Sequence, residues 1–424
     1  MYLDENPEMP GRRVWQSMSD QAFRMHFANQ KIEVDNKLVL LGKAWLESPD
    51  RPSAIGLTFD AAVSPADSIN ARIKNGRLNL WTGFGVAPVR KEGGWKRLES
   101  MIRDDLCAGN ESHFEYLLKW IAYKIQNPGL PSETSVVFRG PKGVGKTTLG
   151  EILVDIFGSH LLVVSRRSQF AGQFSGHLAT ACFVFADEAV WGGNKEDEGT
   201  LKKLITDRHV LYRAMYKEEA YGVNRVGLMM ATNEDWAVPA TFEERRFVVL
   251  EVSGKHRVTG PHDTANRAYW DALYAEIRGG GREAFFYDMQ KTSLGDWTPK
   301  LGAPKTEALG SQIIEGLRGI DRWYYEMLTE GVLPHPAHLN ERDWELSGQF
   351  LSYKVLLSDC REWMRRNRQQ ASITPKGLAN KLKPFGWRRG RTSKTKGLVA
   401  PSHVEAIAAF EKRLGCSIFD DSKR

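Results

Sequence analysis

Short apolar runs alternate with amphipathic stretches through the middle of the chain. Four short apolar runs predict buried strands at 136–138, 181–186, 226–231 and 247–252. After the first, apolar residues recur at helical spacing from Leu149 to Phe157, and Gly158 should end that helix. Strands alternating with helices are typical of a mainly parallel sheet covered by helices on both faces. The predicted fold class is therefore α/β.

The flanking regions carry different patterns. Residues 1–95 mix short apolar runs with turn residues and suggest no chemistry, whereas residues 96–126 become helical and a Pro- and Gly-rich turn follows them. The segment from Tyr269 to Gly331 is mostly helical. Beyond it we expect helices at about 349–368, 374–383 and 402–414, with a basic hairpin at 387–397. We expect five parts, at 1–95, 96–132, 133–252, 253–338 and 339–424.

Composition narrows the class of protein. Hydrophobic residues make up 42% of the 424 residues, and no apolar run approaches the roughly 20 residues needed to cross a bilayer. The N-terminus lacks the basic-then-apolar order of a signal peptide. The four cysteines are far apart and form no C-x-x-C pair. We therefore expect a reduced, cytoplasmic protein without membrane contact or structural metal.

Positive charge is concentrated near the C-terminus. From Arg361 to Lys396 there are twelve Lys and Arg residues and one acid, Glu362. This excess of eleven is larger than the net charge of the whole chain, +7, so the remainder is slightly acidic. Such a segment predicts a polyanionic partner.

A glycine-rich turn of the pattern G-x-x-x-x-G-K-T follows the first strand and opens a helix. This arrangement predicts the phosphate-binding loop of a nucleoside triphosphatase, with ATP as the expected cofactor. Lys146 would reach the β- and γ-phosphates, and the hydroxyl of Thr147 would hold Mg²⁺. A purely structural loop is the alternative. The predicted nucleotide-binding residues are Gly140, Pro141, Lys142, Gly143, Val144, Gly145, Lys146, Thr147 and Thr148.

Polar residues end the second and third strands. We expect Asp187 to bind Mg²⁺ with Thr147, and Glu188 to act as the general base that polarises the attacking water. The alternative is a pair of charges at a helix N-terminus. Asn233 would lie beside the γ-phosphate and position the water, although an Asx turn is the competing interpretation.

Two further features would have a function only in a ring of subunits. Arg245 or Arg246 could reach the nucleotide of the next subunit and stabilise the transition state, and the sequence does not say which; a surface ion pair with Glu243 or Glu244 is the alternative. Alternation on both sides of a polar centre predicts a hairpin at 211–225. Lys217 at its tip could bind DNA phosphates in a central pore, or be an ordinary surface lysine.

The order of these motifs resembles that of superfamily 3 helicases, a branch of the AAA+ ATPases. The chain is most similar to the helicase part of phage primase-helicases of the deep-sea vent phage type. The similarity is strong over residues 78–252, looser to Gly331 and only architectural beyond. The motifs that carry it lie at 120–122, 126–129, 139–147, 185–189, 231–236, 238–239 and 244–247.

This resemblance implies a hexameric ring that hydrolyses ATP between subunits and moves 3′ to 5′ on single-stranded DNA. It implies an ATP and Mg²⁺ site at Lys146, Thr147, Asp187, Glu188 and Asn233, with Lys217 on DNA. The family often carries an N-terminal primase-polymerase domain. Fewer than 100 residues precede the helical lead here, without a plausible acidic triad, so we expect no priming activity. A separate primase or polymerase partner, or a longer parent chain, would account for this.

The C-terminal pattern of two helices and a basic hairpin resembles a winged helix. The helix at 374–383 would enter the major groove of duplex DNA. Phosphate contacts would come from Arg388, Arg389, Arg391, Lys394 and Lys396. The alternative is a solvated basic face on a domain that mediates oligomer contacts.

Other functions share the same nucleotide site. A helicase loader would use nucleotide as a switch without unwinding DNA. A replication initiator would bind duplex DNA through the C-terminal part, with ATP controlling assembly. A small-molecule kinase also has such a loop, but would have no use for the hairpin, the paired arginines or the basic segment.

Overall fold

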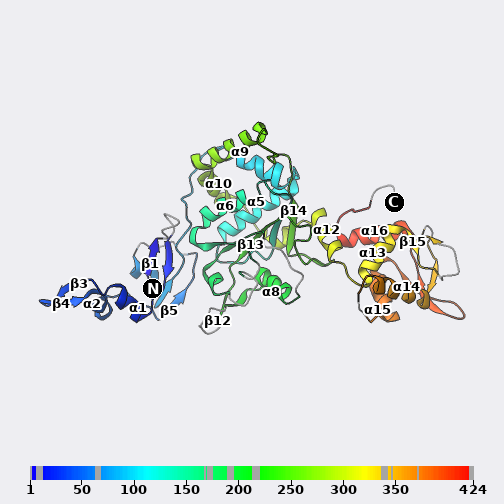
Figure 1. The fold of residues 1–424 in the computed structure, drawn as a ribbon, viewed down its shortest axis with the longest axis horizontal. Coiled ribbons are helices and arrows are strands. Elements are labelled where there is room, and N and C mark those ends of the chain that lie inside the picture. The colour runs from blue at the N-terminus through cyan, green and yellow to red at the C-terminus, as the bar shows by residue number, and fades with distance from the viewer. Residues whose placement is uncertain are drawn as a thin grey trace. The chain divides into compact units, whose positions relative to one another are not determined.

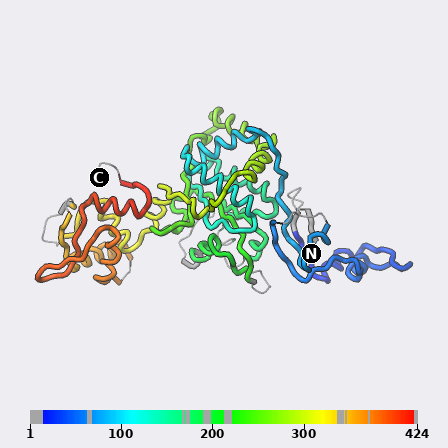
Figure 2. The backbone as a smooth tube through the Cα atoms, turned by 180° about the vertical axis from the view of Figure 1, so that it is seen from behind, coloured from blue at the N-terminus to red at the C-terminus, as the bar shows by residue number. Residues whose placement is uncertain are grey.

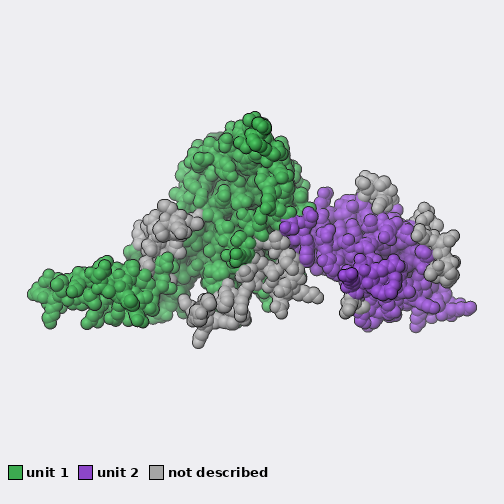
Figure 3. All heavy atoms as spheres, in the orientation of Figure 1, with its two compact units in different colours: residues 1–190, 194–233, 251–302 green, residues 191–193, 234–250, 303–424 purple. Residues whose placement is uncertain are grey.

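A computed structural model of the chain describes residues 2–5, 13–62, 68–166, 169, 175–188, 195–212, 220–335, 342–344, 347–369 and 372–419. The chain divides into two compact units (Figure 3). Unit 1 comprises residues 1–190, 194–233 and 251–302, and unit 2 comprises residues 191–193, 234–250 and 303–424. The five-part division expected from the sequence stays a prediction.

The central sheet has the strand order β14-β8-β13-β10-β9. Strands β13 and β14 are labelled in Figure 1. Its strands are β8 (Ser135–Arg139), β9 (Leu161–Val164), β10 (Phe183–Asp187), β13 (Gly227–Thr232) and β14 (Phe247–Glu251). The pairs β9–β10, β10–β13 and β13–β8 are parallel. Every residue of β13 is buried, so both faces of the sheet are covered there. The predicted α/β class and parallel sheet are confirmed.

The four predicted strands are present, but a fifth was missed. Strand β9 follows a short 3-10 turn, η2 (Gly158–His160), directly after the helix that Gly158 ends. It forms the edge of the sheet, and its central residues are partly exposed. The sequence analysis ended the helix at Gly158 and assigned no element to these four residues.

Two helices cover the same face of the sheet. They are α5 (Glu111–Gln126) and α6 (Lys146–Phe157). The ring of Trp120 meets that of Phe183 edge-on at 5.7 Å, and a Cβ added to Gly150 would lie 2.5 Å from the Phe185 ring. Phe183 and Phe185 are two residues apart in β10, so their side chains lie on the same face of the sheet. Helices α5 and α6 therefore both pack on that face.

Parallel pairing brings the C-terminal ends of β8, β13 and β10 to one edge of the sheet. Asp187 pairs with Ala231, and Thr232 pairs with Arg139. The C-terminal ends of β8, β13 and β10 are therefore level. Ligands of open α/β sheets bind at this edge.

The N-terminal part of unit 1 is the blue part of the backbone in Figure 2. It consists of short elements in small sheets. These are β1 (Tyr2–Glu5), β2 (Arg13–Gln16), α1 (Asp20–His26), β3 (Lys31–Val34), β4 (Lys37–Leu40), α2 (Leu41–Glu47), β5 (Gly56–Thr58), α3 (Ile69–Arg72), β6 (Ile73–Lys74) and β7 (Arg77–Asn79). The ring of Phe59 and that of Trp81 both pack on His160 of the central core. This contact joins the last of the small sheets to the core around the central sheet.

The remaining elements of unit 1 surround the sheet. They are α4 (Lys96–Ser100), the π-helical turn η1 (Met101–Leu106), η3 (Gly176–Thr180), α8 (Lys195–Thr206), β11 (His209–Tyr212), β12 (Ala220–Val223), α9 (Thr264–Glu276), η4 (Ile277–Gly281), α10 (Arg282–Lys291) and α11 (Pro299–Gly302). Strands β11 and β12 pair antiparallel, so the predicted hairpin is confirmed. Lys217 lies outside the described residues.

Unit 2 contains helices and a three-stranded antiparallel sheet of order β17-β19-β18. Its elements are α12 (Glu307–Gly316), α13 (Ile320–Glu330), β15 (Val332–Leu333), β16 (Arg342–Asp343), β17 (Phe350–Ser352), α14 (Tyr353–Arg366), α15 (Pro375–Leu382), η5 (Lys383–Phe385), β18 (Arg388–Arg391), β19 (Lys396–Val399) and α16 (His403–Leu414). The helix expected at 349–368 is shorter, because its first residues pair with β19 as a strand before Ser352 caps α14. Among the described residues no helix is long and apolar enough to cross a membrane.

A buried lysine connects α5 with the segment that leads into β13. The ammonium of Lys124 donates to the carbonyl oxygens of Asn127 at 3.4 Å and Pro128 at 3.2 Å. It also donates to the carbonyl oxygen of Leu130 and to that of Arg225, the latter at 2.6 Å. The side chain is fully buried, and burial lowers its pKa to about 8. The lysine ammonium therefore supplies hydrogen-bond donors to carbonyl groups of the Pro- and Gly-rich turn that follows α5.

We predict that Lys124→Met lowers the stability of unit 1 by about 2–3 kcal/mol, because several buried carbonyl groups lose their donor. Lys119→Met, on the exposed side of the same helix, is the control and should change stability by less than about 0.5 kcal/mol. Thermal unfolding followed by circular dichroism measures both. Equal unfolding temperatures for the two variants would contradict the assigned role of Lys124.

Candidate active site

The loop between β8 and α6 depends on glycines in the left-handed region. Gly143 has a φ of 76° and Gly145 a φ of 84°, values that residues with a Cβ adopt only with strain. Gly145 also caps α6, and a Cβ there would lie 2.3 Å from the indole of Trp270. The backbone conformation favours glycine at both positions, and the Trp270 ring requires it at Gly145 as well.

Lys146 begins α6, and its side chain turns back into the loop. Its ammonium donates to the carbonyl oxygens of Gly140 at 2.6 Å and Pro141 at 2.7 Å, and to Oδ1 of Asn233 at 2.7 Å. Only 7% of the residue is exposed. Burial lowers the lysine pKa, against the opposing attraction of Glu188 and Asp187. The cation is thus held at the centre of the loop.

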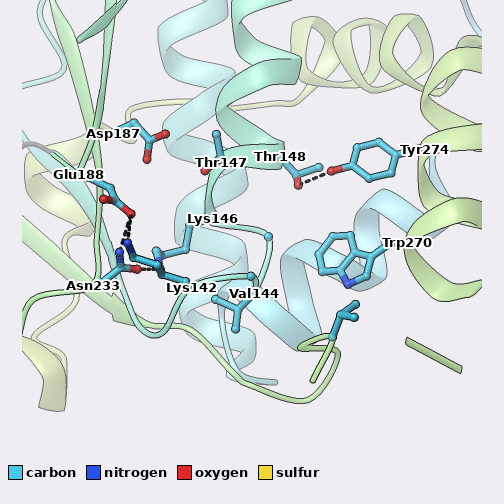
Figure 4. Close-up of a pocket in the computed structure, with 13 residues that line it drawn as sticks. Lys142, Val144, Lys146, Thr147, Thr148, Asp187, Glu188, Asn233, Trp270 and Tyr274 are labelled. Carbon is cyan, nitrogen blue, oxygen red and sulfur yellow. Dashed lines mark hydrogen bonds and ion pairs between the residues drawn. The ribbon is translucent and has the colours of Figure 1, made fainter. Parts of the chain in front are cut away.

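Asn233 connects the lysine to a carboxylate on the neighbouring strand. Its amide nitrogen donates to Oε1 of Glu188 at 2.6 Å (Figure 4). Glu188 follows β10 with a φ of 55°, and its own N–H donates to the carbonyl of Ala231 at 2.9 Å. A glutamate in the left-handed conformation is strained, and such strain is typical of functional sites. Lys146, Asn233 and Glu188 form one hydrogen-bonded chain.

Asp187 and Thr147 lie together on the other side of the lysine. Both side chains line the same pocket. Burial raises the pKa of Asp187, and the charge of Glu188 adds to this, whereas Lys146 and Thr147 oppose it. A carboxylate and a hydroxyl on adjacent elements are suitable ligands for Mg²⁺, which keeps several waters and uses few protein oxygens. The described residues contain no group of three or more His, Cys, Asp or Glu that could hold a metal.

These side chains line one pocket of about 400 Å³, together with a part that the sequence analysis missed. Val258, Trp270 and Tyr274 complete its wall, and Tyr274 contacts the Thr148 hydroxyl at 3.2 Å. Trp270 and Tyr274 stand one turn apart on α9, more than a hundred residues after the loop. Their i, i+4 spacing was visible in the sequence, but it is also the spacing of an ordinary packed helix.

The paired arginines belong to unit 2 and differ in their environment. One carboxylate oxygen of Glu244, a buried residue, accepts from both arginine backbone N–H groups, at 3.0 Å for Arg245 and 2.8 Å for Arg246. The Arg246 guanidinium also lies 3.4 Å from it. Arg245 is exposed. Arg246 therefore pairs with Glu244, one of the two glutamates of the expected alternative, but Glu244 is buried and the pair is not the surface ion pair expected.

The predicted DNA-contacting cations of unit 2 lie on the hairpin of β18 and β19. All five are exposed: Arg388, Arg389, Arg391, Lys394 and Lys396. Trp387 at the base of the hairpin is buried and packs against the ring of Trp344 at 5.7 Å. The hairpin is thus anchored by apolar contacts and presents its charge to solvent.

Comparisons with known proteins give a fold and no established activity. A family described as being of unknown function (DUF5906) matches residues 138–246, which include the loop, both carboxylates, Asn233 and the paired arginines. A search of curated proteins found no match.

Solved structures of one protein match most of the chain. An apo structure of the NrS-1 C-terminal region matches with a TM-score of 0.58 and 16% identity, over 88% of this chain and 93% of that one. An A-form apo structure of the same region matches with a TM-score of 0.55 and 15% identity, over the same shares. At this identity the likeness shows a shared fold.

We predict that Asp187→Asn raises the unfolding temperature of the nucleotide-free protein at neutral pH by about 2 °C or more. In the native state a half-buried carboxylate lies beside Glu188, which is unfavourable, and the neutral amide removes this cost. Because the folded pKa of Asp187 is raised, the wild-type carboxyl binds its proton more tightly when folded, so the difference should shrink as pH falls.

Asp50→Asn, at an exposed aspartate, is the matched control and should change nothing. Thermal scans between neutral and mildly acidic pH test the effect. A lower unfolding temperature for Asp187→Asn throughout would mean that Lys146 and Thr147 outweigh burial.

Proposed function

We propose that the chain is an ATP- and Mg²⁺-dependent motor of phage or mobile-element DNA replication, which assembles into a ring and moves on single-stranded DNA. The single observation that carries the proposal is the convergence of Lys146, Thr147, Asp187, Glu188 and Asn233 on one pocket. These residues come from the start of α6 and from the ends of two strands, β10 and β13. Few sites other than those of nucleoside triphosphatases need these five residues together.

The chemistry assigned to the site is hydrolysis of the terminal phosphoanhydride. Glu188 accepts the proton of a water whose oxygen attacks the γ-phosphorus, and the bond to the bridging oxygen breaks to give ADP and phosphate. Lys146 neutralises charge on the β- and γ-phosphates. Thr147 and Asp187 would hold Mg²⁺, which supplies electrostatic stabilisation of the phosphate oxygens when bound.

Asn233 has a specific part in this proposal. Its amide joins Lys146 to Glu188, so the position of the base is linked to that of the cation. A phosphate that draws Lys146 away from Asn233 would free the amide, and with it the carboxylate, to orient the water. The base would then be placed when nucleotide is bound.

A ring is proposed because of the arginines. Arg246 is held by Glu244, whereas Arg245 is exposed, so we assign the trans-acting finger to Arg245. Hydrolysis would then require a neighbouring subunit. The hexameric number comes from the helicase resemblance, and the shared fold with the NrS-1 C-terminal region supports that resemblance.

DNA contacts are proposed at two places. The hairpin of β11 and β12 would contact single-stranded DNA with Lys217, and the exposed cations of β18 and β19 would bind phosphates of duplex DNA. The order of α14, α15 and a β-hairpin supports a winged-helix-like module.

A second candidate function is a helicase loader or an ATP-regulated initiator. The basic hairpin of unit 2 favours it, since a duplex-binding surface serves an initiator as well as a motor. A partner primase or polymerase would complete either assembly.

We predict that Lys146→Ala lowers the ATP hydrolysis rate at least about 100-fold, because the developing charge on the phosphates loses its cation. Lys43→Ala, at an exposed lysine of the N-terminal part, is the control and should hydrolyse at the wild-type rate. A phosphate-release assay measures both. Undiminished hydrolysis by the Lys146 variant would show that the activity lies elsewhere.

We also predict that replacing Arg388, Arg389 and Arg391 with Gln weakens duplex binding and lowers the slope of log affinity against log salt by up to about 3. The control with the same change in charge replaces exposed Lys31, Lys37 and Lys43 with Gln. Fluorescence anisotropy at several salt concentrations distinguishes them. An equal loss in both triple variants would point to net charge alone.

A further inference from the structure

The pocket has two chemically different ends. Asp187, Glu188 and Asn233 lie at one end, and Trp270 and Tyr274 lie at the other, with the start of α6 between them (Figure 4). Phosphate and metal chemistry uses the polar end. The aromatic end has no part in it, although it belongs to the same pocket of about 400 Å³.

The two rings present one face to the start of α6. Trp270 and Tyr274 are one turn apart on α9, with ring centroids 6.4 Å apart and planes tilted by 36°. The edge of the indole borders Gly145, and the phenol oxygen of Tyr274 lies 3.2 Å from the Thr148 hydroxyl. Neither ring is fully buried. An aromatic surface therefore begins where the phosphate loop ends.

A polar cluster around the buried Asp105 fixes the position of Trp270. The indole N–H donates to the carbonyl of His256 at 2.8 Å. The His256 ring stacks on that of Tyr269 at 3.7 Å, and both contact the Asp105 carboxylate, with Nδ1 of His256 at 2.8 Å and the Tyr269 hydroxyl at 2.7 Å.

Asp105 is 1% exposed and belongs to η1, a π-helical turn of a kind often found at functional sites. The aromatic wall is thus held in place by residues from both sides of the nucleotide-binding core.

We propose that this aromatic face binds the base of the nucleotide, with Trp270 as the stacking surface and Asp105 as a positioning residue. The inference rests on the proposed function and adds which chemical group the second end recognises. A nucleoside triphosphate carries its base at the end opposite the γ-phosphate, and the pocket has a π surface at the matching end. Stacking on an indole is tolerant of base identity but grows with ring area, so purines bind better than pyrimidines.

The test separates base recognition from phosphate recognition. Isothermal titration calorimetry in the presence of Mg²⁺ measures the binding of three ligands to the full chain. These are ATP, CTP and inorganic tripolyphosphate, which has no base. Trp270→Ala should weaken ATP binding about tenfold and leave tripolyphosphate binding unchanged. Trp270→Phe keeps a ring and should stay within about threefold of the wild type for ATP.

Two controls make the result specific. Trp45→Ala removes an exposed tryptophan far from the pocket in sequence and should bind like the wild type. Tyr269→Phe removes one hydrogen bond to Asp105 and should weaken ATP binding less than Trp270→Ala does, again with tripolyphosphate unaffected. Wild-type protein should prefer ATP to CTP.

Each contrary result has its own meaning. Wild-type ATP affinity in Trp270→Ala would overturn the stacking role and leave the ATPase proposal standing. Equal loss of ATP and tripolyphosphate would show that Trp270 supports the loop without touching the base, which also overturns the inference. A wild-type chain that binds neither ligand would overturn the proposed function itself.

Discussion

The site depends on one buried cation. Lys146 is held by two carbonyl groups of its own loop and by Asn233 of a neighbouring strand, which in turn holds Glu188. A lysine so enclosed needs several acceptors to offset its desolvation, and the loop glycines allow the backbone to supply them. The parallel register then brings the ends of β10 and β13 level, so a cation, an amide and two carboxylates meet.

Much of this arrangement was predictable because it is encoded locally. The phosphate loop needs glycines at fixed offsets, and polar residues directly after apolar strands mark the edge of a parallel sheet. Asp187, Glu188 and Asn233 could therefore be placed before their contacts were known. The hairpin at 211–225 and the C-terminal helices followed from the same kind of periodicity.

What escaped prediction depends on contacts between distant segments. Trp270 reaches the loop only because the chain after β14 returns to the sheet, and no local pattern announces that return. The Asp105 cluster joins residues about 150 positions apart in the same way. Strand β17 looked helical because its strand identity comes from its partner β19. Periodicity reports local structure, whereas pairing decides such short segments.

The central claim is that this nucleotide site drives a ring-forming motor on single-stranded DNA. The most direct measurement is the ATP hydrolysis rate with and without single-stranded DNA, on protein sized by light scattering in the presence of ATP and Mg²⁺. The account predicts a ring-sized assembly whose hydrolysis is strongly stimulated by the DNA. A monomer or dimer whose hydrolysis ignores DNA would contradict it and favour the loader or initiator.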